Sequence, residues 1–271
     1  MSEKKNIRNN IIAISGTPVS GKSTAIKTIK AQLMEEGYKE ENIHLIKVGQ
    51  QFRDAFNSVV DFMKKFEESK SEPKKENQDP MLKLFLSKKE YKDAIFETME
   101  NLRLNKVDLS KFTIEQANEA EEFAPIRAVI DFVIDQRTAD MGKEINSEPH
   151  PDEVWIFDSR LAFHNIPEAF SVRLVCDEDV AAQRLFNDRE RGAEDSNYAS
   201  IEEAKQAVIG RKQAETERYI NIYDIDLNDE SQYDLIVDTS MATPDAIARS
   251  IIKRSKSYFA KFRKPGEEIE Y

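Results

Sequence analysis

The sequence predicts an α/β fold built on a parallel sheet of five strands, with a helical insertion after the second strand. Two observations lead to this prediction. Short apolar runs alternate with amphipathic helical patterns near both ends of the chain, as in sheets that are covered by helices. Between them, residues 54–141 carry helical patterns and no strand pattern. The 271 residues are enough for one large domain with such an insertion.

The first alternating segment contains two strands and one helix. Residues 11–14 (IIAI) form a short apolar run, typical of a buried parallel strand. A helix is expected over residues 22–36, where apolar residues recur on one face, and Gly37 is placed to end it. Residues 43–48 (IHLIKV) predict the second strand.

The insertion is predicted to be helical and interrupted by one linker. Residues 67–80 contain no hydrophobic residue, which indicates a mobile connection. Thr113 and Gln116 have the spacing of a capping box at a helix start. The helical patterns cover residues 52–66, 81–104, 113–123 and 126–141.

The α/β pattern returns in the carboxyl half. Three further strands are expected at residues 154–157, 171–176 and 233–237. Asp177 or Asp179 can cap the helix that follows the second of these strands. Residues 187–199 are polar and predict a loop, after which Ser200 and Glu203 have capping-box spacing. Thr243-Pro244 opens the last helix.

Composition excludes several classes of function. The net charge of −11 argues against broad nucleic-acid binding, which needs basic patches to displace counterions. The single cysteine, Cys176, excludes an intramolecular disulfide, and the sequence has no Cys/His spacing of a zinc site. No apolar run approaches 18 residues, so no membrane span is expected. We therefore expect a soluble, cytoplasmic protein with neither nucleic acid nor membrane as partner.

Residues 16–23 (GTPVSGKS) match the phosphate-loop pattern G-x-x-x-x-G-K-[ST] at every fixed position. Glycines let backbone N–H groups surround a phosphate, and the following helix adds its positive end. Lys22 would contact the β- and γ-phosphates of ATP, and the Ser23 hydroxyl would bind Mg²⁺. An ordinary glycine turn is the alternative. The predicted nucleotide-binding residues are Gly16, Thr17, Pro18, Val19, Ser20, Gly21, Lys22, Ser23 and Thr24. With its flanking strand and helix, this loop predicts the three-layer P-loop NTPase fold.

Four segments of the carboxyl half resemble the cytidylate kinase family, most closely its short branch. They are residues 158–162 (DSRLA), 172–175 (VRLV), 211–226, with the pattern R-x-x-x-E-x-x-R-Y, and 233–240 (YDLIVDTS). The resemblance covers about residues 10–55 and 130–252. It implies transfer of the γ-phosphoryl group of ATP to a nucleoside monophosphate, CMP or dCMP, with Mg²⁺.

The resemblance also implies a set of site residues. Arg53, Arg160, Arg211 and Arg218 would bind the acceptor, with Glu215 between the last two. A lid over residues 187–199 and the helix before it would bring Arg184, Arg189 and Arg191 to the donor phosphates, so that the catalytic set is Lys22, Arg160, Arg184, Arg189 and Arg191. Asp158, at a predicted strand end, would hold a Mg²⁺ water together with Ser23 or fix Arg160; capping the next segment is its alternative role.

The expected domain organisation follows the same resemblance. Residues 1–53 and 142–263 would form the kinase core, residues 54–141 the insertion, and residues 264–271 a tail. The insertion occupies the part of the fold that clamps the acceptor base in the family, which leaves CMP, dCMP, UMP or an unrelated acceptor open. Val19 and Ser159 replace glycines that are usual in the family. The chain would be a monomer, or a dimer through the insertion.

Two rival functions remain open from the residues alone. A P-loop kinase that phosphorylates a hydroxyl would need a general base, for which Asp158 is the candidate. A nucleotide-binding regulatory protein would use the insertion to contact a partner without turnover. The positions 211, 215 and 218 share one helix face, but such charges also form salt-bridge ladders on solvated helices. The three histidines match no catalytic motif.

Overall fold

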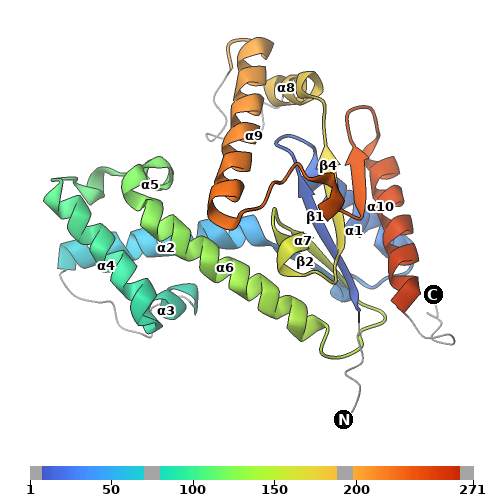
Figure 1. Cartoon of the computed structure of the whole chain (residues 1–271), viewed down its shortest axis with the longest axis horizontal. Helices are drawn as coiled ribbons and strands as arrows, with labels where there is room; N and C mark the ends of the chain where they lie inside the picture. The colour runs from blue at the N-terminus through green and yellow to red at the C-terminus, as the bar shows by residue number, and fades with distance from the viewer. Residues whose placement is uncertain (1–7, 70–79, 188–197, 263–271) are drawn as a thin grey trace. The chain divides into compact units, whose positions relative to one another are not determined.

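Five strands form one parallel sheet in the order β2-β3-β1-β4-β5, as the computed structural model shows (Figure 1). The strands are β1 (Asn10–Gly16), β2 (Ile43–Lys47), β3 (Val154–Asp158), β4 (Phe170–Val175) and β5 (Leu235–Asp238). The structure describes residues 8–69, 80–187 and 198–262. It confirms the predicted α/β class and the five parallel strands. The predicted tail, residues 264–271, lies outside the described residues, as does most of the predicted lid.

The chain divides into two compact units. The first unit comprises residues 1–47 and 138–271 and contains the sheet, and the second comprises residues 48–137 and is helical. In the described residues, no helix is both long and apolar enough to cross a membrane.

One face of the sheet carries the main apolar core of the first unit. Ile12 and Ile14 of β1 pack there against α1 (Lys22–Glu35) and α10 (Pro244–Phe259). Because side chains alternate across a strand, the intervening residues face the other way. On that opposite face, the ring of Phe163, in the short helix α7 (Ala162–Asn165), contacts Tyr233 with a centroid distance of 4.9 Å. The sequence analysis did not predict α7.

The predicted helix ends of the first unit are confirmed. Gly37 has a φ of 96° after α1, and the Tyr38 N–H donates to the Leu33 carbonyl at 3.0 Å, which closes the helix end. Asp177 accepts hydrogen bonds from the first turn of α8 (Glu178–Asn187). Ser200 caps α9 (Ile201–Tyr223), and Thr243 caps α10.

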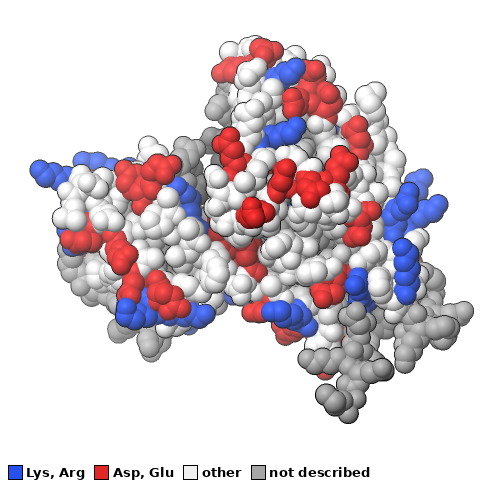
Figure 2. Space-filling view, in the orientation of Figure 1, with Lys and Arg blue, Asp and Glu red and all other residues white. Residues whose placement is uncertain are grey.

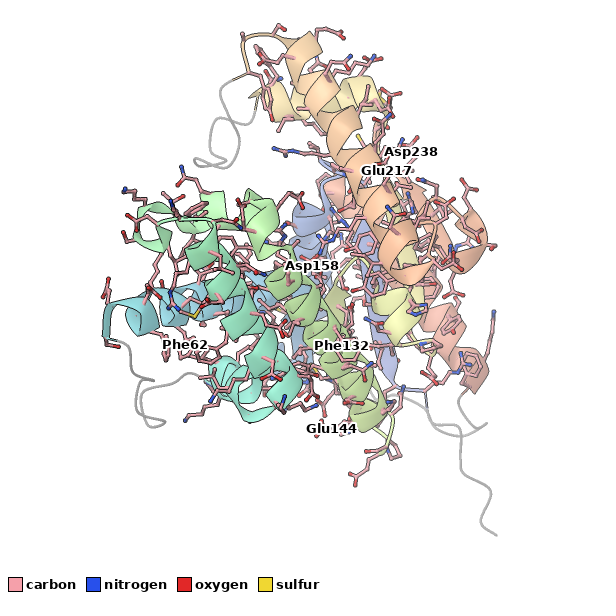
Figure 3. All side chains as sticks on the ribbon, turned by 60° about the vertical axis from the view of Figure 1, so that its left-hand side comes forward. Phe62, Phe132, Glu144, Asp158, Glu217 and Asp238 are labelled. Carbon is pink, nitrogen blue, oxygen red and sulfur yellow. The ribbon has the colours of Figure 1, made fainter. Side chains whose placement is uncertain are left out.

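The second unit packs five helices around aromatic side chains. Phe62 belongs to α2 (labelled in Figure 3), and its ring meets that of Phe96 in α4 edge to face at 6.2 Å. Phe56 packs against Phe123 in the same way. The helices are α2 (Val48–Ser69), α3 (Pro80–Ser87), α4 (Lys89–Leu104), α5 (Ile114–Glu119) and α6 (Ala124–Ile145), whose last turns belong to the first unit.

Three predicted boundaries in this region need correction. Helix α2 continues to Ser69, so the predicted linker at residues 67–80 begins too early; its residues 70–79 lie outside the described part. The expected helix over residues 81–104 is two helices, because Lys88 has an extended backbone between them. Helix α6 extends beyond both ends of the predicted 126–141. The capping box of Thr113 and Gln116 is confirmed.

The only tryptophan of the chain lies in β3 between two histidines. Trp155 is 8% exposed, and its ring stacks on His44 at 5.0 Å and meets His150 edge to face at 5.3 Å. Both imidazoles also contact the carboxylate of Glu153. These two histidines are thus held by neighbours at the amino end of the sheet, and the carboxyl ends of the strands carry the predicted site.

Charge is unevenly distributed over the first unit. On the face drawn in Figure 2, acidic side chains lie over α9, and basic side chains gather over α10. The net acidic composition is therefore a sum of regions of opposite sign.

Candidate active site

The predicted phosphate loop connects the end of β1 to the start of α1, and its two glycines are required for different reasons. A Cβ on Gly16 would lie 2.5 Å from Ser20 Oγ and 3.1 Å from the Leu174 carbonyl oxygen, so the loop and β4 leave no room for a side chain. Gly21 has a φ of 75° directly before α1, a conformation that favours glycine. The loop conformation therefore depends on both glycines.

Val19, where the family usually has glycine, also adopts a positive φ of 60°. This conformation is strained for a β-branched residue. The Val19 side chain packs against a small apolar cluster of α8 and α9 that includes Leu185 and Val208. Packing in that cluster offsets part of the backbone strain.

Lys22 forms an ion pair with Asp158, and both side chains are 19% exposed. Asp158 ends β3, beside both Ile14 of β1 and Lys47 of β2 in the strand register (Figure 3). The carboxylate therefore contacts the predicted nucleotide lysine, and its roles toward Mg²⁺ and Arg160 stay predictions. The exposed Ser23 follows Lys22 in the first turn of α1.

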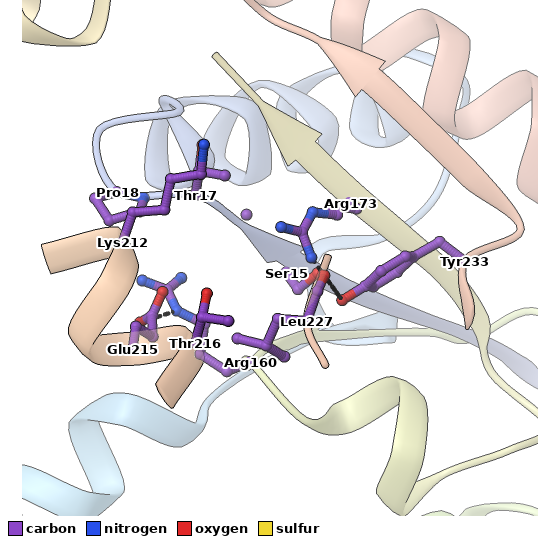
Figure 4. A pocket seen from close by; sticks show the side chains of 11 residues that line it. Ser15, Thr17, Pro18, Arg160, Arg173, Lys212, Glu215, Thr216, Leu227 and Tyr233 are labelled. Atoms are coloured by element: carbon purple, nitrogen blue, oxygen red, sulfur yellow. Dashed lines mark hydrogen bonds and ion pairs between the residues drawn. The ribbon is translucent and has the colours of Figure 1, made fainter. Parts of the chain in front are cut away.

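Arg160 is paired with α9 across a small pocket. Its Nε donates to Glu215 Oε1 at 2.5 Å, and both side chains are about three-quarters buried. The Lys212 side chain, about one helical turn before Glu215, lines the same pocket (Figure 4), and its ammonium donates to Glu178 at 2.9 Å. The pocket is lined by Ser15, Gly16, Thr17, Pro18, Arg160, Arg173, Lys212, Glu215, Thr216, Leu227 and Tyr233. The structure thus brings Arg160 and Glu215 together beside the phosphate loop.

Arg211 and Arg218 lie on α9 but are exposed and do not line this pocket. Arg211 donates to the Tyr198 hydroxyl at 3.4 Å, and the Arg218 guanidinium lies 5.9 Å from the ring centre of Tyr219. The pocket instead receives Lys212, Glu215 and Thr216 from this helix. The acceptor role of both arginines remains a prediction.

Arg184 is linked to the phosphate loop through Thr239. It lies in α8 and donates to the Thr239 carbonyl at 2.5 Å, while the Thr239 hydroxyl donates to the Ser20 carbonyl at 3.0 Å. The Nη1 atom of Arg184 would also lie 4.0 Å from a Cβ placed on Gly21. Among the other predicted arginines, Arg189 and Arg191 lie outside the described residues. Arg53 belongs to the second unit, where it donates to Gln50 at 2.8 Å.

Sequence reasoning missed three polar residues of the site. Arg173 is 8% exposed in β4, Tyr233 contacts it, and Thr239 supports the loop. Arg173 carried a usable signal, since a charged residue inside an apolar strand is buried only when something in the fold compensates it. The roles of Tyr233 and Thr239 depend on contacts with residues far away in the chain, which no local pattern reveals.

Comparison with known proteins gives consistent relatives. The chain is 32% identical over 130 residues to a cytidylate kinase of Pyrococcus furiosus, which covers 48% of this chain and 59% of that protein. A cytidylate kinase of Pyrococcus abyssi is 30% identical over 48% of this chain and 63% of its own length. That of Methanobrevibacter smithii is 28% identical over 51% and 72%, respectively. The chain is thus similar to cytidylate kinases over about half of its length.

The similarity of the chain to these cytidylate kinases is partial. The chain spans about 60% of the length of the first two relatives, and each match covers about half of this chain. No family model matches the sequence. A solved structure of an uncharacterized protein from Eubacterium ventriosum aligns over 92% of this chain and 98% of its own, with 15% identity. Its TM-score of 0.46 is too low to establish a common fold.

Proposed function

We propose that this protein is an ATP-dependent kinase that transfers the γ-phosphoryl group to a nucleoside monophosphate, CMP or dCMP. The observation that carries the proposal is the phosphate loop with its lysine beside a pocket lined by Arg160, Arg173 and Lys212. The matches to cytidylate kinases support a nucleoside monophosphate kinase role.

The strand order supports a three-layer P-loop NTPase fold. In the strand order, β2 and β3 lie on one side of β1, toward one edge of the sheet. The chain then passes β1 to reach β4 and β5, toward the other edge. Ligands of open parallel sheets bind at the carboxyl ends of the strands where the order reverses in this way. The phosphate loop follows the central strand β1, so it lies at such a reversal.

In this proposal the charged side chains act mainly by electrostatics. The acceptor phosphate is largely ionised at neutral pH, so the transfer needs no general base. The obstacle is repulsion between two polyanions and the charge on the transferring group. Lys22 would leave Asp158 for the β- and γ-phosphates, and Arg160 would exchange Glu215 for a phosphate oxygen. Guanidinium groups suit this role because they bind phosphate through two parallel hydrogen bonds.

The residues present fit ATP and Mg²⁺. The buried hydroxyl oxygens of Thr17 and Ser20 have no hydrogen-bond partner among the described residues, which leaves polar capacity in the loop for a ligand. Mg²⁺ uses one or two protein oxygens and completes its shell with water and phosphate. The Ser23 hydroxyl and the Asp158 carboxylate would be those oxygens. The ion would neutralise phosphate charge when bound.

An assay of ADP release with ATP and each nucleoside monophosphate tests the proposal. We expect the highest turnover with CMP or dCMP, and a turnover at least tenfold lower in a Lys22→Ala preparation purified in parallel, which controls for contaminating kinases. Absence of turnover with every nucleoside monophosphate would contradict the proposal. Turnover of a hydroxyl acceptor, with Asp158→Asn as the most damaging substitution, would favour the rival kinase.

A closing lid over residues 187–199 belongs to the same proposal, with Arg184, Arg189 and Arg191 at the donor phosphates. The acceptor side would use Arg53, Arg211 and Arg218 with Arg160. Hydrogen exchange with and without a bisubstrate analogue tests the lid. Protection should rise over residues 187–199 when the analogue binds, and unchanged exchange there would count against a lid.

A further inference from the structure

Arg173 is a charged residue inside the central part of the sheet. It lies in β4, next to Ser15 of β1 in the strand register, and only 8% of it is exposed. Its neighbours Val172 and Leu174 point into the apolar core under α1 and α10, so Arg173 points to the opposite face. Arginine is rarely buried to this extent unless an anion or a set of hydrogen bonds compensates its charge.

The side chains that accept hydrogen bonds from Arg173 are neutral. Its Nη1 donates to the Tyr233 hydroxyl at 3.1 Å, and its Nη2 donates to Asn228 Oδ1 at 3.0 Å. Burial raises the pKa of Tyr233 above its ordinary value, so this hydroxyl stays protonated at neutral pH. Among the described residues, no carboxylate forms an ion pair with Arg173. Hydrogen bonds thus orient the guanidinium, but its charge is not balanced there.

The pocket wall around Arg173 has more positive than negative charge. Of the lining side chains, Arg160, Arg173 and Lys212 are cationic and only Glu215 is anionic. Glu215 is engaged by Arg160, and Figure 4 shows Arg173 directed into the space between Ser15 and Arg160. Thr17, whose hydroxyl is buried without a partner among the described residues, lines the same pocket. A phosphate oxygen would satisfy both the hydroxyl and the unbalanced charge.

We infer that Arg173 binds an oxygen of the acceptor phosphate at the sheet face opposite α1 and α10, and that Tyr233 and Asn228 hold its guanidinium in place. This inference rests on the proposed function and adds a ligand that the motif of the phosphate loop does not contain. Arg173 would complement Arg160. Arg160 must exchange Glu215 for the phosphate, whereas Arg173 has no carboxylate to release within the described part of the chain.

The test compares Arg173→Gln with Arg249→Gln, a substitution of an exposed arginine on α10. With the active nucleoside monophosphate, Arg173→Gln should raise the acceptor KM at least tenfold, because a hydrogen bond to a charged group is lost. Its ATP dissociation constant should change less than threefold, and Arg249→Gln should change neither. Arg173→Lys should recover part of the acceptor binding.

A purely structural role of Arg173 predicts a different result. Arg173→Gln would then lower the melting temperature and leave the acceptor KM of the folded fraction unchanged, which would overturn the inference. If Arg173→Gln does not fold, Tyr233→Phe retains the charge and removes one anchor. It should raise the acceptor KM severalfold, and an unchanged KM would again overturn the inference.

Binding of inorganic phosphate separates this inference from the proposed function. In a Lys22→Ala background, where the phosphate loop has lost the point charge of its lysine, adding Arg173→Gln should weaken phosphate binding at least tenfold. Unchanged phosphate affinity would overturn the role of Arg173 even in an active kinase. If no nucleoside monophosphate is turned over but phosphate binding falls as expected, the anion site stands and the proposed kinase function fails.

Discussion

The cations at the carboxyl edge of the sheet differ in whether they already have an anionic partner. Lys22 is paired with Asp158, Arg160 with Glu215 and Lys212 with Glu178, whereas Arg173 is held by neutral groups. The pairs of Lys22 and Arg160 are mostly buried, so the cost of desolvating both charges offsets much of their mutual attraction. They can therefore open at small cost when a phosphate competes for the cation.

Lys22→Ala should reduce phosphoryl transfer by at least tenfold without unfolding the protein. The substitution removes the point charge that would meet the β- and γ-phosphates, and one preorganised donor is typically worth about 10²-fold or more. The exposed Lys27→Ala, also on α1, is the matched control and should keep full turnover. Turnover is measured at saturating ATP, and circular dichroism checks the fold. A loss smaller than tenfold would contradict the assignment of the phosphate loop.

Arg160→Lys should weaken use of the acceptor by roughly tenfold or more, because an ammonium cannot reproduce the paired hydrogen bonds of a guanidinium. The expected change is a higher KM for the nucleoside monophosphate with little change for ATP. Arg218→Lys should act in the same direction if that exposed arginine turns toward the acceptor on binding. Full activity of the Arg160→Lys variant on CMP would argue against this acceptor site.

Tyr233 should make folding stability depend on alkaline pH. Burial raises the pKa of its hydroxyl above the ordinary value of 10.0, despite the opposing charge of Arg173. The folded state therefore retains the proton at a pH where the unfolded state loses it. The resulting stability is fully present below about pH 10 and is lost as pH rises through the folded pKa.

Chemical denaturation at a series of pH values tests this linkage. The free energy of unfolding of the wild type should fall more steeply above pH 10 than that of Tyr233→Phe, because the variant has no ionisable group at this position. Parallel curves for the two proteins above pH 10 would show that Tyr233 does not titrate differently in the folded state.

Among the secondary-structure elements, those with both an apolar pattern and an end signal were predictable. The helices capped by Thr113, Ser200 and Thr243 begin at the predicted residues, because a cap is a local hydrogen bond between near neighbours. The strands were found to within about two residues. No glycine or proline marks the helix break at Lys88 in the sequence. Helix α7 has four residues, too few for the repeating apolar spacing on which helix prediction depends.

The candidate site was predictable only where a motif is contiguous. The phosphate loop is one run of eight residues whose spacing encodes its geometry. The contact of Arg160 with Glu215 joins residues 55 positions apart, and that of Arg173 with Tyr233 joins residues 60 apart. Helical spacing predicted that 211, 215 and 218 share a face, but only tertiary contacts decide which part of that face meets the pocket.

Two glycines inside helices should respond in opposite ways to the same substitution. A Cβ on Gly142 in α6 would lie 2.8 Å from two carbon atoms of Ile166 and 3.3 Å from its Cβ, so a rotamer change alone cannot relieve the clash. A Cβ on Gly210 in α9 would meet nothing within 4 Å. Gly142→Ala should therefore destabilise the protein by about 1–3 kcal/mol, as overpacking does.

Gly210→Ala should instead stabilise α9 by about 0.5–1 kcal/mol, because alanine loses less backbone entropy than glycine in a helix. The measurement is the free energy of unfolding of both variants in urea. Effects of the same sign and size would mean that helix propensity, and not the contact with Ile166, determines the response at Gly142.

At the scale of the whole chain, the sheet and the helical unit each have their own apolar core. The core of the first unit joins residues from both ends of the sequence, from β1 to α10. The second unit is continuous in sequence, from residue 48 to 137, and is built around phenylalanine rings. A unit that is continuous in sequence can open without breaking the sheet, so cooperative unfolding of the whole chain is not required.

The fluorescence of Trp155 reports on only one of these units. As the sole tryptophan, buried in β3 of the sheet, it makes intrinsic fluorescence follow the first unit, whereas circular dichroism at 222 nm follows the helices of both. We expect urea transitions by the two methods to have different midpoints; coincident transitions would indicate one cooperative structure. Trp155 is thus a native fluorescent probe of the sheet that needs no dye or engineered residue, and the helical unit contributes no tryptophan emission of its own.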